Sequence, residues 1–216
     1  MTTVESFDQD LRSADVIVLG RKRMPVPGYK PRGPWRGGDL QTLHNFITRP
    51  APDFSEYAEE RLFLPMNDGS GDRLWALLNR PIKDTGKPAI VLVHGLTGCE
   101  TSRNIMVSAA YHLTNGHPVV RLNLRGAGPS LGESRGHYHA GRSSDLRDAL
   151  FGLPADLKAR GVFVVGVSLG GNMALKFAAE NEDMDDVLGV ASVCAPIDLK
   201  AAQERIMSPR NALYHW

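Results

Sequence analysis

Cysteine is scarce in this chain, and it has no long apolar run. The 216 residues include two cysteines, Cys99 and Cys194, each within or beside an apolar stretch. This number argues against a disulfide scaffold, and we interpret both as thiols of a reducing compartment. The longest apolar runs, such as Ala89–Val93, fall far short of the roughly 18 residues of a membrane-spanning helix.

The chain also lacks an excess of charge of either sign. It has 25 basic and 24 acidic side chains, for a formal net charge of +1. This balance gives no reason to expect nucleic acid as a partner. The first ten residues, "MTTVESFDQD", lack the basic segment and long apolar stretch of a secretory signal. We therefore predict a cytoplasmic protein without a transmembrane segment, with a length that suits one large domain.

The N-terminal quarter differs in composition from the rest. Residues 1–56 are rich in Pro and Gly and poorly periodic, which predicts an arm with one short helix within residues 40–47. Residues 57–216 form the predicted core. Within the arm, Gly20–Gly38 is basic and contains no acidic residue. Peripheral contact with an anionic membrane surface is one interpretation. A solvated connecting arm is the other, and we favour it.

From residue 57 onward, strand-like and helix-like segments alternate. Residues 60–81 predict two strands joined by a turn at 67–72. Buried strands are then predicted in four segments and helices in three. The strands are 88–95, 117–126, 162–166 and 187–196, and the helices are 102–116, 143–161 (with Ser143 or Ser144 as N-cap) and 169–182. This alternation predicts an α/β fold whose mostly parallel sheet carries helices on both faces.

A serine lies between glycines where one of these strands meets a helix. Gly166–Gly170 reads "GVSLG", which fits the G-x-S-x-G pattern of a nucleophile elbow. The small residues allow a sharp turn that exposes Ser168 at the carboxyl edge of the sheet. The helix N-terminus behind it offers free N–H groups to a developing oxyanion. Ser168 is therefore the candidate nucleophile.

Two other interpretations of these glycine-containing turns compete with a nucleophile elbow. Ser168 could simply cap a helix after a tight turn. Upstream, Gly126, Gly128 and Gly132 resemble a dinucleotide-binding loop. Pro129 falls where the phosphate-binding helix should begin, so we predict no cofactor.

A second loop could complete an oxyanion hole. His94-Gly95 follows the buried strand "AIVLV". In acyl-transfer sites of this geometry, such a loop donates one backbone N–H, and the residue after the serine donates the other. We assign these donors to the backbones of Leu96 and Leu169.

These motifs together resemble the α/β-hydrolase superfamily. More narrowly, Gly38–Leu43, His94–Ser102, His137–Leu146 and Gly166–Phe177 resemble the YheT-like esterase branch. The similarity extends from about Tyr29 to the C-terminus. It implies a serine carboxylesterase or lipase that acts on small acyl esters through a Ser-Asp-His triad, with no cofactor and no metal.

The rest of that triad is hard to find in the sequence. In this fold the acid and then the histidine follow the serine, and the only histidine after Ser168 is His215. We expect the fold to lack its last strands here, so that the acid and the base lie beyond residue 216. Asp198 could serve as the acid, although a capping role is favoured.

Several other polar residues are interpreted as structural. His94 is expected to make local hydrogen bonds, and Asp145 and Asp148 to favour the N-terminus of a helix. The pair His137 and His139 is a weak metal-site pattern, because it has no nearby Cys or carboxylate cluster.

The sequence therefore predicts a partial ester hydrolase with nucleophile Ser168. Two alternatives stay open: an inactive remnant that serves as a binding module, and an acyltransferase or amidase on the same fold. The last predicted strand, Val187–Pro196, should form an apolar sheet edge prone to self-association.

Overall fold

The computed structural model describes residues 30, 33–34, 36–37, 40–41, 51–209 and 211. The chain divides into two compact units, Met1–Pro50 and Ala51–Trp216. In the first unit Leu40 and Gln41 are helical, and the rest of the helix predicted at 40–47 lies outside the described residues. The predicted boundary between arm and core, after residue 56, stays a prediction. The second unit, Ala51–Trp216, contains the sheet and its helices.

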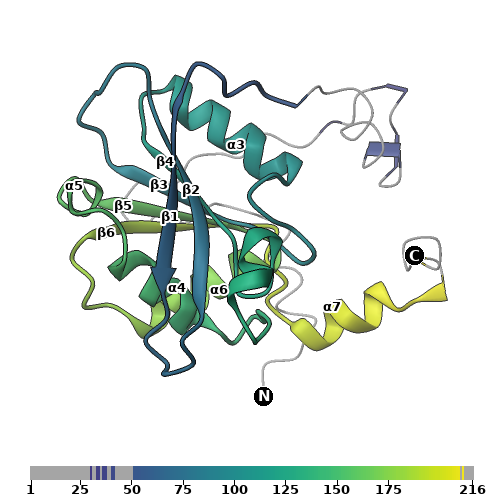
Figure 1. Ribbon diagram of the computed structural model, residues 1–216. Helices are drawn as coiled ribbons and strands as arrows, with labels where there is room; N and C mark the ends of the chain where they lie inside the picture. Colours follow the sequence, from purple (N-terminus) through teal and green to yellow (C-terminus); the bar gives the residue numbers. More distant parts are fainter. Residues whose placement is uncertain are drawn as a thin grey trace. The chain divides into compact units, whose positions relative to one another are not determined.

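One sheet organises this unit (Figure 1). Its strands are β1 (Ala58–Pro65), β2 (Arg73–Arg80), β3 (Ala89–Val93), β4 (Val119–Leu122), β5 (Val162–Val167) and β6 (Val187–Val193). Their order in the sheet is β1-β2-β4-β3-β5-β6. Strands β4, β3, β5 and β6 are parallel, and β2 is antiparallel to both β1 and β4. Every residue of β3 and β4 is buried. This burial explains why β3 is a continuous apolar run and why β4 is apolar apart from Arg121.

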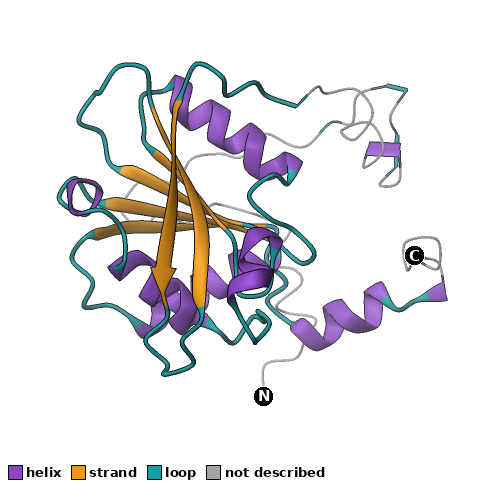
Figure 2. Ribbon diagram, viewed as in Figure 1, coloured by secondary structure: helices purple, strands orange, loops and turns teal. Residues whose placement is uncertain are grey.

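Helices lie on both faces of the sheet, as predicted (Figure 2). They are α3 (Arg103–Thr114), α4 (Ser143–Phe151), α5 (Ala155–Lys158), α6 (Leu169–Glu180) and α7 (Leu199–Ile206), with a 3₁₀ helix η2 at Gly128–Glu133. Helix α3 covers one face, and α4 and α6 cover the other. Helix α7 buries none of its residues.

The N-cap predicted for α4 is wrong. Ser143 is the first residue of α4, and Arg142 occupies the cap position without a side-chain hydrogen bond. The Ser143 hydroxyl instead donates to the carboxylate of Glu180, at the end of α6. A tertiary partner has replaced the local capping bond that the sequence suggested.

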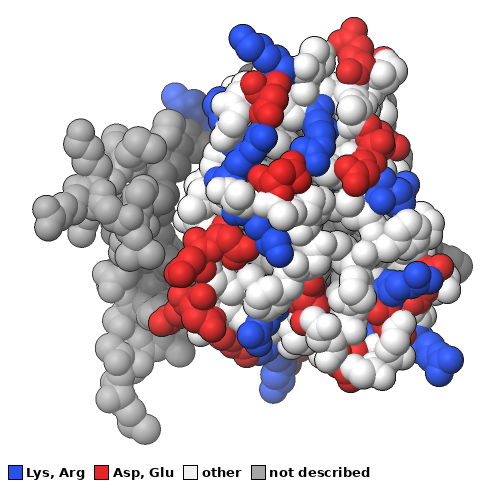
Figure 3. All heavy atoms as spheres, turned by 60° about the vertical axis from the view of Figure 1, so that its left-hand side comes forward, with Lys and Arg blue, Asp and Glu red and all other residues white. Residues whose placement is uncertain are grey.

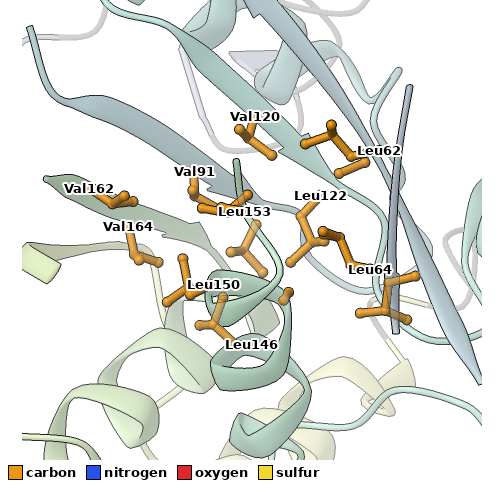
Figure 4. Packing of buried hydrophobic residues seen from close by; sticks show 14 of the residues in the cluster. Leu62, Leu64, Val91, Val120, Leu122, Leu146, Leu150, Leu153, Val162 and Val164 are labelled. Carbon is orange, nitrogen blue, oxygen red and sulfur yellow. The ribbon is translucent and has the colours of Figure 1, made fainter. Parts of the chain in front are cut away.

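Two hydrophobic clusters fill the spaces on either side of the sheet. The larger lies between the sheet and α4 and α6 and includes Val91, Val164, Leu146 and Leu150, which Figure 4 shows pointing toward one another. The smaller packs α3 against the other face through Ile90, Leu92, Ile105, Ala109, Leu113 and Val119. Burial of this apolar surface is the main stabilising contribution to the fold.

Strand β6 forms one edge of the described sheet. It pairs with β5 alone, and all its residues are partly or fully exposed. Leu188 is 51% exposed and Val193 is 45% exposed. The predicted apolar edge strand is therefore confirmed within the described residues.

The outer surface carries both signs of charge. On the face shown in Figure 3, basic side chains are interspersed with acidic ones. No helix in the described part is long and apolar enough to cross a membrane.

Candidate functional site

Ser168 forms the junction between β5 and α6. It is the single residue between Val167 and Leu169, and its backbone has φ +54° and ψ −120°. Such a conformation costs an L-residue about 1–3 kcal/mol, so the surrounding structure must stabilise this backbone geometry. The Ser168 N–H donates to the Val193 carbonyl at 2.8 Å, and its carbonyl accepts from the Asn172 N–H at 3.1 Å. These bonds fix the turn between the neighbouring strand and the helix.

The glycines around Ser168 are required by close packing. A Cβ on Gly166 would lie 2.2 Å from the Gly170 carbonyl oxygen, and one on Gly170 would lie 2.4 Å from the His94 carbonyl oxygen. A Cβ on Gly171 would lie 2.7 Å from the Ser192 hydroxyl. Two of these obstacles are backbone atoms that cannot rotate away. The helix can therefore begin this close to the sheet only with glycine at these positions.

The Ser168 hydroxyl faces the loop that follows β3. The ideal Cβ position of Gly95 lies 3.0 Å from the Ser168 Cβ and 3.5 Å from its Oγ. Ser168 is half-buried. Its hydroxyl makes no hydrogen bond to any residue in the described part of the chain. In particular, no histidine or carboxylate from residues 51–209 is bonded to it.

Several backbone donors of the β3–α3 loop make hydrogen bonds within the fold. The N–H groups of Thr97, Gly98, Cys99 and Glu100 donate, in order, to Tyr138 Oη at 2.7 Å, the Gly95 carbonyl at 3.1 Å, Ser102 Oγ at 2.9 Å and Asn123 Oδ1 at 2.8 Å. Within the described residues, the N–H of Leu96 has no acceptor. The N–H of Leu169, in the first turn of α6, is likewise unpaired there, as expected of a helix N-terminus. The sequence predicts these two N–H groups as oxyanion donors, and that assignment stays a prediction.

Both ring nitrogens of His94 make hydrogen bonds within the fold. Its Nε2 accepts from the Leu124 N–H at 3.1 Å, and its Nδ1 lies 2.8 Å from the Gly95 carbonyl oxygen. Since one nitrogen must accept and the other must donate, the ring is the neutral Nδ1–H tautomer. Burial lowers the pKa of His94, which keeps it neutral. With both nitrogens engaged, His94 has no free position for proton transfer, and the predicted local role is confirmed.

The other polar candidates lie as follows. Asp198 accepts from the Ala201 N–H at 2.9 Å and caps α7, the role favoured from the sequence. His139 Nδ1 accepts from the Gly141 N–H at 3.2 Å. Among the described residues, no three His, Cys, Asp or Glu side chains are grouped as metal ligands would be. His215 lies outside the described residues.

The Gly126-Gly128-Gly132 segment does not open an α-helix. Gly128–Glu133 forms the 3₁₀ helix η2, with Pro129 in its first turn. A dinucleotide-binding loop needs an α-helix N-terminus at this point. In this segment Pro129 therefore begins a short 3₁₀ helix in place of an α-helix.

Sequence reasoning missed a buried ionic cluster beside this site. Arg125, 1% exposed, makes two hydrogen bonds to Asp145, at 2.9 and 2.7 Å. It also donates to Asp72 at 2.5 Å and to Asp68 at 2.9 Å. Asp145 does lie in the first turn of α4, but its main partner is this guanidinium. The pairing could not be read from the sequence, because the partners are separated by 20 to 57 residues.

Comparisons with known proteins identify relatives of this chain. The family model for the alpha/beta hydrolase fold matches residues 88–216. The putative esterase YheT of Escherichia coli is 32% identical over 178 residues, which cover 81% of this chain and 50% of that protein. The medium-chain fatty acid ethyl ester synthase/esterase 2 of Saccharomyces cerevisiae is 29% identical over 120 residues, covering 55% of this chain and 26% of that protein.

A solved structure shares the fold. The Pyrococcus furiosus esterase Pf2001 superimposes with a TM-score of 0.59 at 17% identity, covering 74% of this chain and 62% of that one. The chain thus spans about half the length of YheT and about a quarter of the length of the yeast protein.

Proposed function

Because this chain belongs to the α/β-hydrolase fold family, we propose that it carries the nucleophile and the oxyanion hole of a serine carboxylic-ester hydrolase. Ser168 is the nucleophile, and the backbone N–H groups of Leu96 and Leu169 are the oxyanion donors. The observation that carries the proposal is their arrangement: a serine at φ +54° packs against Gly95, in a loop whose Leu96 N–H has no acceptor within the described residues. Two of the relatives are named as esterases, which supports an ester as the substrate.

The chemistry proceeds through an acyl-enzyme. Ser168 Oγ attacks the ester carbonyl carbon while a base takes the hydroxyl proton. The carbonyl oxygen becomes an oxyanion, which accepts hydrogen bonds from the two N–H groups. When the tetrahedral intermediate collapses, the alcohol leaves with the proton from the base, and the acyl group stays on Ser168. Water activated by the same base then releases the carboxylic acid.

The base and its orienting acid are not among the groups bonded to Ser168 in the described part. We propose that both come from polypeptide beyond Trp216. The alternative is an inactive remnant that acts as a binding module, and the unpartnered Ser168 hydroxyl favours it. The printed name of the yeast relative also includes ester synthesis, so an alcohol in place of water is a further acceptor for the same acyl group.

A fluorophosphonate probe, with and without added imidazole, separates these cases. Imidazole can stand in for a missing histidine base. We expect the purified chain to form an adduct at Ser168 only when imidazole is present, as measured by intact-mass and peptide mass spectrometry. Ser168→Ala should abolish it. Ser192→Ala is the matched control, since that hydroxyl lies at the end of the neighbouring strand and is buried without a hydrogen-bond partner.

Each outcome decides between the proposals. Labelling without imidazole places a working base on this chain and contradicts a base beyond Trp216. Labelling only with imidazole supports an intact nucleophile without its base. If neither condition labels Ser168, the nucleophile proposal is wrong for this chain and the binding-module alternative remains.

A further inference from the structure

We propose that Tyr138 is a positioning residue for the oxyanion hole: its hydroxyl holds the turn Gly95–Gly98 so that the Leu96 N–H faces the reacting carbonyl. The inference rests on the function proposed above. It begins from the contact between Tyr138 Oη and the Thr97 N–H, at 2.7 Å, which joins segments 41 residues apart.

The turn itself is strained. Gly98 N–H donates to the Gly95 carbonyl at 3.1 Å, which closes a four-residue turn with Leu96 and Thr97 at its centre. Thr97 has φ +57°. Positive φ at this position is usual for glycine or asparagine, but for a β-branched residue it is an outlier. Something outside the turn must therefore stabilise it.

Tyr138 supplies that stabilisation on one side of the central peptide group. Its hydroxyl accepts the Thr97 N–H, while the Thr97 hydroxyl donates to the Leu96 carbonyl at 2.7 Å. Both polar atoms of the Leu96–Thr97 peptide thus have partners. The same contact occupies the Thr97 N–H, whereas the Leu96 N–H has no acceptor within the described residues.

Tyr138 is itself firmly held. Its own N–H donates to the Arg125 carbonyl at 2.9 Å, and Arg125 is fixed by the buried aspartates. Its ring meets the His94 ring edge to face, with centroids 5.5 Å apart, and packs against the larger hydrophobic cluster. The hydroxyl is therefore presented to Thr97 from a rigid support on the other side of the loop.

Rigidity matters here because oxyanion donors act through preorganisation. Without the Tyr138 hydroxyl, Thr97 is free to relax toward negative φ, as in the commoner turns. The Leu96 N–H, one peptide away, would then lose its fixed direction.

The test uses Tyr138→Phe, which removes the hydroxyl and keeps the ring. Three quantities are measured on the full chain: the rate of fluorophosphonate labelling of Ser168 with imidazole present, the amide hydrogen exchange of the segment 95–99, and the thermal midpoint. Tyr111→Phe is the matched control, because that ring is 66% exposed on α3. We expect Tyr138→Phe to slow labelling by about tenfold and to speed exchange in this segment, while the control changes neither.

A second substitution distinguishes positioning from general loosening. Glycine adopts positive φ without strain, so Thr97→Gly in the Tyr138→Phe background should restore much of the labelling rate. Equal labelling and exchange in Tyr138→Phe and the wild type would overturn the proposal. So would slow labelling that Thr97→Gly does not rescue, whatever the thermal midpoint. If the wild type is never labelled, the proposed function itself fails, which is a different result.

Discussion

Three residues other than glycine have positive φ in the described part of the chain: Thr97, Ser168 and Cys194, at 57°, 54° and 53°. Each lies just past the carboxyl end of a parallel strand, after β3, β5 and β6 in turn. Strained residues of this kind concentrate at functional sites, and ligands of α/β proteins bind at this edge of the sheet. The strain therefore marks the same edge as the candidate site, independently of the G-x-S-x-G motif.

The packing of Gly170 gives a prediction at this scale. A Cβ there would lie 2.4 Å from the His94 carbonyl oxygen and 2.6 Å from that of Val93. Gly170→Ala should force α6 away from β3 and lower the free energy of unfolding by about 1–3 kcal/mol or more, measured by urea denaturation. Gly132→Ala is the control, since nothing lies within 4 Å of its Cβ position. Equal stability of the two variants would show that the glycine motif is not set by packing.

At the scale of elements, β6 is an edge strand of the described sheet that pairs with β5 alone and buries none of its residues. The row Phe163, Val165 and Val167 on β5 is also only partly covered, whereas β3 and β4 are fully buried. Unpaired N–H and C=O groups on an apolar edge favour pairing with another chain. We therefore expect concentration-dependent self-association through β6.

A charge on this edge tests that expectation. Ala191 is exposed and pairs with Val165. Ala191→Lys should lower the associated fraction in sedimentation velocity, because lysine on an edge strand opposes strand pairing. Tyr111→Lys, on the exposed face of α3, adds the same charge elsewhere and should leave association unchanged. A wild type that is monomeric at every concentration would rule out the edge as a contact.

At the scale of the whole molecule, Arg125 and its aspartates join distant parts of the chain. Asp72 and Asp68 come from the β1–β2 turn, Arg125 follows β4, and Asp145 lies in α4. The Arg135 backbone N–H, followed by the Arg125 guanidinium, holds the pKa of Asp72 below its ordinary value. Hydrogen bonds from Ser70 do the same for the pKa of Asp68.

The direction of these shifts predicts acid sensitivity. Since the unfolded chain takes up protons first, the stabilisation is complete above the ordinary carboxyl pKa of about 3.9 and is lost as pH falls through the lower folded values. The free energy of unfolding should therefore decrease on acidification below about pH 4. Asp72→Asn should be less stable at neutral pH by about 1–3 kcal/mol and should lose less on acidification. Urea titrations at several pH values measure both, and identical pH profiles would contradict the assignment.

Much of this arrangement could be predicted from local sequence. The hairpin, the buried strands, the helices on both faces and the sheet edge at β6 follow from periodicity and turn residues, because these signals act over a few residues. The position of Ser168 between β5 and α6 follows from its motif and context. The predicted N-cap of α4 is wrong, because the Ser143 hydroxyl donates a hydrogen bond to Glu180 on α6.

What the sequence determined by itself is the set of segments and the candidate chemistry: strands and helices in order, a serine between glycines, and a His-Gly loop. Only the tertiary structure decided which polar groups meet. It paired Arg125 with three aspartates, engaged both nitrogens of His94 in hydrogen bonds, and placed the Tyr138 hydroxyl against the Thr97 N–H. The reason is physical, since periodicity reports burial along one segment, whereas a hydrogen bond between distant residues depends on how several segments pack together.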